Sequence, residues 1–129
     1  MTAVDTNIVV RLLTDDHAQQ TAAARSLFAA GPIWIGRTVL LEVDWVLQSV
    51  YNFDKADVCA AFSRLLGLGN VHTDDKASVA NAITLTLAGL EFADALHLTA
   101  RPAGAAFASF DEKFVRRATR AGITEIFSA

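Results

Sequence analysis

The stretch Thr2-Ala3-Val4-Asp5-Thr6-Asn7 places a carboxylate directly after a short run of uncharged residues. The run Thr2 to Val4 predicts a strand, because uncharged β-branched side chains favour extended backbone. Asp5 then lies at the carboxyl end of that strand, ahead of an apolar helix expected over residues 8–13. Ligands of parallel α/β sheets bind outside the carboxyl ends of the strands. Asp5 is therefore a candidate site residue, and its alternative role is to cap the following helix.

Further short apolar runs alternate with helical patterns along the rest of the chain. We expect strands at residues 33–35, 71–73, 105–110 and 125–127, and helices at 16–30, 39–50, after Asp54, after Asp74 or Asp75, at 92–101 and at 112–121. Strands separated by helices imply right-handed crossovers and a parallel sheet covered on both faces. The sequence predicts an α/β fold in one domain over residues 1–129, a three-layer α/β/α sandwich with a mostly parallel central sheet.

Helical periodicity also predicts which faces are buried. In the helix after Asp54 the expected buried residues are Val58, Ala61, Phe62, Leu65 and Leu66, and in the next helix they are Val79, Ala82, Ile83, Thr86 and Leu87. In helix 16–30 we expect Ala22, Ala23, Leu27 and Ala30 to point inward. In helix 39–50 we expect a stripe centred on Val39, Val43, Val46 and Val50, with Glu42 at its border and Asp44 on the far side.

The composition limits the class of protein. Apolar residues make up 53% of the 129 residues, but no apolar run approaches the length of about 18 residues that spans a bilayer. We expect a second subunit or a partner to cover the apolar surplus. Met1 precedes the first strand so closely that no signal peptide fits, which predicts a cytoplasmic protein. Cys59, the only cysteine, excludes an internal disulfide and is expected to be a buried, inert side chain.

The net charge of −3 is not that of a generic basic nucleic-acid-binding protein. If Asp5, Glu42, Asp94 and Asp111 hold cations, however, the rest of the chain is close to neutral. Four of the eleven lysines and arginines also lie between Lys113 and Arg120. A polyanionic substrate is therefore compatible with the charge.

Three carboxylates besides Asp5 occupy comparable settings. Glu42 borders the buried stripe of an apolar helix, unless its stem simply reaches solvent. Asp94 lies in the first turn of a helix, where the helix dipole alone favours an acid, and His97 is its expected hydrogen-bond partner. Asp111 follows a strand, with Ser109 on the same side two residues earlier. Its alternative role is again a helix cap.

Four acids side by side cannot all stay ionised without a cation. Oxygen ligands with no clustered cysteine or histidine favour Mg²⁺ or Mn²⁺ over zinc. Such ions activate a water molecule and neutralise the charge that develops on a phosphodiester. We therefore expect Asp5, Glu42, Asp94 and Asp111 to be metal ligands and catalytic residues of a nuclease.

Four segments together resemble the signature segments of the PIN-domain ribonucleases, most closely the VapC-type toxins of bacterial toxin–antitoxin pairs. These segments are Ala3-Val4-Asp5-Thr6-Asn7, Leu41-Glu42-Val43, Phe92-Ala93-Asp94-Ala95-Leu96-His97 and Ser109-Phe110-Asp111. The resemblance covers essentially the whole chain. It implies an endoribonuclease that uses Mg²⁺, with Thr6, Asn7 and Ser109 orienting the acids or a bound water. It also implies a homodimer and a small antitoxin protein that covers the site.

The helix after Asp111 carries a basic stripe, because Lys113, Arg116, Arg117 and Arg120 recur at helical spacing. The stripe is a candidate for binding RNA or the antitoxin. The alternative is a solvated face whose cations complement the carboxyl end of the helix.

Other functions fit the sequence less well. A phosphoaspartyl phosphatase needs a second acid two residues after the first, and Asn7 cannot donate and recover a proton there. No glycine-rich phosphate loop supports nucleotide hydrolysis. The remaining alternative is a PIN-like interaction domain without catalytic activity.

Overall fold

Three short parallel strands organise residues 1–76 in the computed structural model, which describes residues 1–129. Strand β1 (Thr2–Ala3) pairs with β2 (Ile33–Trp34), and β2 pairs with β3 (Val71–His72), so the strand order is β1-β2-β3. The register places Thr2 opposite Ile33. These residues form one compact unit, and residues 77–129 form a second.

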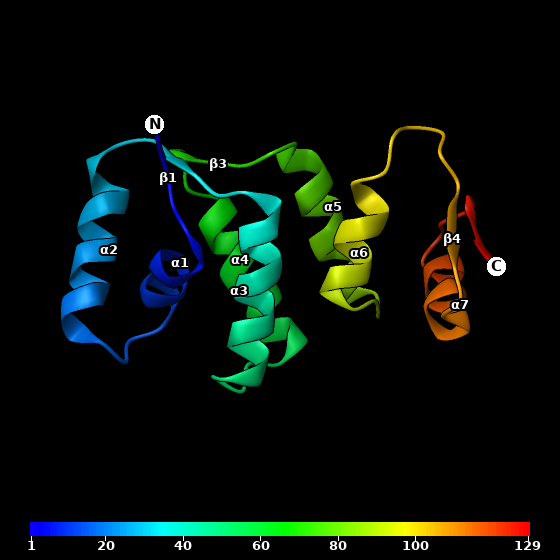
Figure 1. The fold of residues 1–129 in the computed structure, drawn as a ribbon, viewed down its shortest axis with the longest axis horizontal. Helices are drawn as coiled ribbons and strands as arrows, with labels where there is room; N and C mark the ends of the chain where they lie inside the picture. The colour runs from blue at the N-terminus through cyan, green and yellow to red at the C-terminus, as the bar shows by residue number, and fades with distance from the viewer. The chain divides into compact units, whose positions relative to one another are not determined.

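Each connection between neighbouring strands of the first unit contains two helices (Figure 1). Helices α1 (Thr6–Leu13) and α2 (Ala18–Ala30) connect β1 with β2. Helices α3 (Arg37–Ser49) and α4 (Lys55–Leu66) connect β2 with β3. Both crossovers advance in the same direction along the sheet, so right-handed connections place them on the same face. The packing of α1 against both α2 and α3 agrees with this arrangement.

The second unit is built around two parallel strands and the helix between them. Strand β4 (Phe107–Ser109) pairs with β5 (Ile126–Ser128), and α7 (Glu112–Arg120) joins them. Phe114 of α7 packs edge-on against Phe107 of β4, with ring centroids 5.7 Å apart. Helix α5 (Lys76–Leu87) begins at the boundary between the units, and α6 (Phe92–Thr99) follows it.

The predicted order of strands and helices is confirmed, and most ends agree within two residues. The strand expected at 105–110 is shorter, because only Phe107–Ser109 pairs with β5. No helix has the combination of length and apolar character that crossing a bilayer requires. The buried faces of α4 and α5 match the predictions, apart from Leu87, which is exposed.

The predicted buried faces of α2 and α3 are displaced by about one residue, although Val43 of α3 is buried as predicted. Helix α2 buries Thr21, Ala24 and Phe28. Helix α3 buries Leu40, Val43, Asp44 and Leu47, while Val50 is 61% exposed. The alanines of α2 and the almost uniformly apolar residues of α3 give little contrast between faces, so packing against neighbouring helices decides the orientation. Asp44 is consequently buried, and its Oδ1 accepts a hydrogen bond of 2.7 Å from Gln48.

Cys59 is buried in α4, as predicted. Burial raises the pKa of the Cys59 thiol, and the negative charge of Asp44 raises it further. Both effects disfavour the thiolate, which is the form of cysteine that reacts with electrophiles and metals. Cys59 therefore acts as a small apolar side chain.

We expect the native protein to react with a thiol reagent at about pH 8 at least ~10-fold more slowly than the urea-unfolded chain. The raised pKa lowers the thiolate fraction below that of a free cysteine, and burial blocks the reagent. Absorbance of the released chromophore measures both rates. Equal rates for the native and unfolded chains would show that Cys59 is accessible.

Candidate active site

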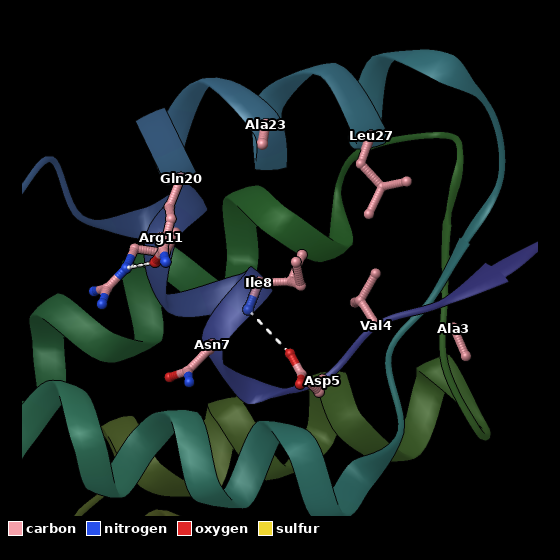
Figure 2. A pocket seen from close by; sticks show the side chains of 9 residues that line it. All are labelled: Ala3, Val4, Asp5, Asn7, Ile8, Arg11, Gln20, Ala23 and Leu27. Carbon is pink, nitrogen blue, oxygen red and sulfur yellow. Dashed lines mark hydrogen bonds between the residues drawn. The ribbon is translucent and has the colours of Figure 1, made fainter. Parts of the chain in front are cut away.

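Asp5 lies between the end of β1 and the first turn of α1, as the sequence predicts. Its Oδ1 accepts a hydrogen bond of 3.2 Å from the backbone N–H of Ile8, which makes it the N-cap of α1 (Figure 2). Asp5 therefore does cap α1, which was its alternative role. It uses one of the two carboxylate oxygens, so capping and ligand binding do not compete for the same atom.

Thr6 connects α1 with Glu42 of α3. The hydroxyl of Thr6, a buried residue, donates a hydrogen bond to Oε1 of Glu42. Glu42 is exposed, as the alternative of a stem that reaches solvent predicts, and it also has a partner in Thr6. Asp5, Thr6, Asn7 and Glu42 line one open pocket of about 290 Å³. The structure thus brings the first two acids together with the two polar residues expected to support them.

The second pair of acids lines another pocket. Asp94, half-buried, lies in the first turn of α6. Asp111 caps α7 by accepting a 3.0 Å hydrogen bond from the N–H of Phe114, and its own N–H donates to Oγ of Ser109 at 3.0 Å. Asp94 and Asp111 line a pocket of about 230 Å³ within the second unit.

His97 does not have the role expected of it. The side chain is exposed, forms no hydrogen bond with Asp94 and lies outside the pocket of the two acids. Residues three positions apart are neighbours on a helix, but the exposed side chain of His97 does not line the pocket. His97 is therefore not placed as a ligand beside Asp94.

The basic stripe of α7 divides into two parts. Lys113 and Arg117 line the pocket of Asp94 and Asp111. Arg116 and Arg120 are exposed and do not line it. The stripe is thus neither wholly a solvated face nor wholly part of the site.

Neither unit by itself gathers three or more histidine, cysteine, aspartate or glutamate side chains at metal-binding distance. The four predicted acids instead form two pairs, one in each unit. Each pair offers only oxygen donors in an open pocket. This donor set fits Mg²⁺ or Mn²⁺, because Mg²⁺ is commonly held by one or two carboxylates and keeps several of its waters.

A larger pocket of about 570 Å³ lies between α2 and the β1–α1 segment (Figure 2). Its wall is mainly apolar, and its polar residues are Asp5, Asn7, Arg11 and Gln20. Arg11 Nε donates to Gln20 Oε1 at 2.6 Å, which ties α1 to the start of α2. Asp5 and Asn7 line this pocket as well as the one that contains Glu42.

A polar cluster holds the far end of α1. Arg11 Nη1 donates to the Tyr51 hydroxyl at 3.0 Å and pairs with Asp16 at 3.3 Å, and Tyr51 donates to Asp16 at 2.7 Å. The hydrogen bond from Tyr51, with the positive charge of Arg11, holds the pKa of the Asp16 carboxyl below its ordinary value. The cluster therefore stays charged and connects α1 with the segment after α3.

Two residues beside the acids were missed from the sequence. Trp45 lines the pocket of Glu42 and is 66% exposed, and Glu91 lines the pocket of Asp94. Their spacing could have indicated both residues, because each lies three positions from an acid and side chains at that spacing are neighbours on a helix.

Comparisons with known proteins are consistent with this geometry. The sequence model of the PIN domain family matches residues 2–119, nearly the whole chain. No curated protein and no solved structure gave a significant match. PIN domains are generally nucleases that bind RNA and commonly use divalent metal ions. The family match and the parallel strands confirm the predicted α/β/α fold class. The chain belongs to the PIN domain family.

Proposed function

We propose that this protein is an endoribonuclease that hydrolyses RNA phosphodiester bonds with Mg²⁺ or Mn²⁺. The observation that carries the proposal is the pairing of acids in a PIN domain: Asp5 with Glu42, and Asp94 with Asp111, each pair lining an open pocket. The alternative is a PIN-like interaction domain without catalysis. The presence of all four acids in pockets favours the nuclease.

In this proposal the carboxylates of each pair, Asp5 with Glu42 and Asp94 with Asp111, are ligands for the divalent metal. When bound, the ion lowers the pKa of a water molecule and offsets the charge that develops on the phosphodiester. The Thr6 hydroxyl fixes the orientation of the Glu42 carboxylate. Ser109 accepts the N–H of Asp111 and so positions the backbone at that acid. The Asn7 carboxamide, on the wall of the Glu42 pocket, is available to donate to water or RNA.

We further propose that the protein is the toxin of a toxin–antitoxin pair, a cytoplasmic homodimer whose cognate antitoxin covers the site. Support comes from large apolar side chains that are exposed, including Trp45, Leu87, Phe110 and Phe127. A partner that covers such side chains removes apolar surface from water, which favours association. Trp45 also lines the Glu42 pocket, so a partner that buries Trp45 covers the mouth of that pocket.

The protein should cleave RNA in Mg²⁺ or Mn²⁺ and stop when a chelator is added. Replacing Glu42 by Gln or Asp94 by Asn should lower kcat/KM by at least about two orders of magnitude, because each change removes a metal-binding carboxylate. Cleavage of a labelled RNA, followed on a gel, measures the rates.

Asp15→Asn is the matched control, since it removes one exposed carboxylate outside both pockets. It should retain the parent rate within about twofold. Robust cleavage in excess chelator, or equal rates for Glu42→Gln and Asp15→Asn, contradicts the proposal.

A second prediction tests the site without its substrate. Asp5→Asn keeps a capping side chain but removes one of two negative charges in the Glu42 pocket, so without metal it should melt at or above the parent temperature. Mg²⁺ well above its Kd should raise the melting temperature of the parent by several degrees, because the ion binds only the folded state. Asp5→Asn should gain much less.

Asp54→Asn provides the control for this melt. Asp54 also caps a helix through its side chain, in a capping box with Asp57, but it lies outside the pockets. Asp54→Asn should therefore keep the full response to Mg²⁺. If both variants respond to Mg²⁺ as the parent does, Asp5 is a helix cap and not a metal ligand.

A further inference from the structure

We propose that Arg117, assisted by Lys113, binds a phosphodiester group of RNA in the pocket that Asp94 and Asp111 line. The pocket then holds RNA through its basic wall and metal through its acidic wall. This inference rests on the proposed function, because it places the substrate of that reaction.

Two cations of α7 lie at the same pocket as the acids. Lys113 and Arg117 are four residues apart and therefore lie on one face of the helix. Both line the pocket of about 230 Å³, together with Asp94 and Asp111. Arg116 has the same charge and lies next to Arg117 in the chain, but it is exposed and outside the pocket.

The surroundings of Arg117 restrict its side chain. Arg117 is half-buried, whereas Lys113 is exposed. It leaves the helix beside the buried residues Phe114 and Ala118, and Phe114 lines the same pocket. Phe114 is itself held edge-on by Phe107 of β4. A half-buried arginine on a packed face has lost much of its conformational freedom, so binding a ligand costs it less entropy.

The charged groups of these two cations have no hydrogen-bond or ion-pair partner in the chain. Neither the guanidinium of Arg117 nor the ammonium of Lys113 forms a hydrogen bond or an ion pair in the chain. Structural arginines that are partly buried usually have such partners. The donors of Arg117 therefore remain available to a ligand at the pocket.

The charge balance identifies the chemistry of that ligand. Glu91, Asp94 and Asp111 are three acids at the pocket wall, and Lys113 and Arg117 are two cations. A purely acidic pocket would attract a metal ion but repel RNA, and the cations offset that repulsion. A guanidinium binds phosphate through two parallel hydrogen bonds, while an ammonium acts as a point charge. This pocket is therefore better suited to a phosphodiester group and a metal ion together than to one of the two alone.

The test compares Arg117→Gln with Arg116→Gln, which removes the same charge from the same helix outside the pocket. Binding of a short single-stranded RNA is measured in Mg²⁺ on a Glu42→Gln background, which suppresses cleavage. Arg117→Gln should weaken binding about 10-fold or more and lower the slope of log K against log salt by about 0.7, the value for one lost phosphate contact. Arg116→Gln should change binding by less than about threefold, and Arg117→Lys should restore part of the loss.

Two measurements separate substrate binding from a structural role. In the otherwise native protein, Arg117→Gln should raise KM for RNA, and the melting temperature should match that of Arg116→Gln. Mn²⁺ binding, followed by electron paramagnetic resonance, should persist in Arg117→Gln and tighten, because a positive charge has left the pocket. A structural arginine would instead lower the melting temperature and weaken Mn²⁺ binding. That result would overturn the inference.

The outcomes distinguish this inference from the proposed function. If the parent cleaves RNA but Arg117→Gln and Arg116→Gln bind RNA equally, the nuclease stands and the role of Arg117 is wrong. If the parent does not cleave RNA but only Arg117→Gln loses RNA binding, the phosphate site stands and the nuclease is wrong. If Arg117→Gln loses binding of an acidic peptide while RNA binding is unchanged, the basic wall binds protein and the inference is overturned.

Discussion

The hydrogen bond from the Thr6 hydroxyl to the Glu42 carboxylate joins residues 36 positions apart, and the first half of the candidate site depends on it. It forms because β1 and β2 are parallel neighbours, so the helices that follow them, α1 and α3, begin at the same edge of the sheet. Thr6 is buried, and a buried hydroxyl without a partner is costly. The same bond therefore satisfies Thr6 and orients Glu42 beside Asp5.

The second unit repeats the construction with different residues. A strand ends, an aspartate caps the next helix, and the pocket begins at that cap. Asp111 and Asp5 both use one carboxylate oxygen for the cap. The partial positive charge of the helix amino end favours an acidic side chain in this position. Capping is therefore part of how the chain positions Asp5 and Asp111.

The distribution of charge explains how a chain with net charge −3 can act on a polyanion. The four candidate site acids line two pockets, and two cations of α7 line one of these pockets. At distances shorter than about 10 Å salt screening is weak, so the local arrangement of charged side chains governs the attraction of a charged ligand. The net charge of the chain matters mainly at longer range. In the proposed nuclease, the local charges of the pockets and not the net charge of the chain attract the RNA backbone.

The sequence by itself determined the order of the elements, the parallel strands, the acids at strand and helix ends, and the buried faces of α4 and α5. These features follow from strong local signals, since residues such as Phe62 and Leu65 contrast sharply with their polar neighbours. Only the tertiary structure decided the faces of α2 and α3, the burial of Asp44, the pairing of Thr6 with Glu42 and the division of the basic stripe. Helical periodicity sets the angles between side chains on one helix, but neighbouring elements decide which of those angles face the core.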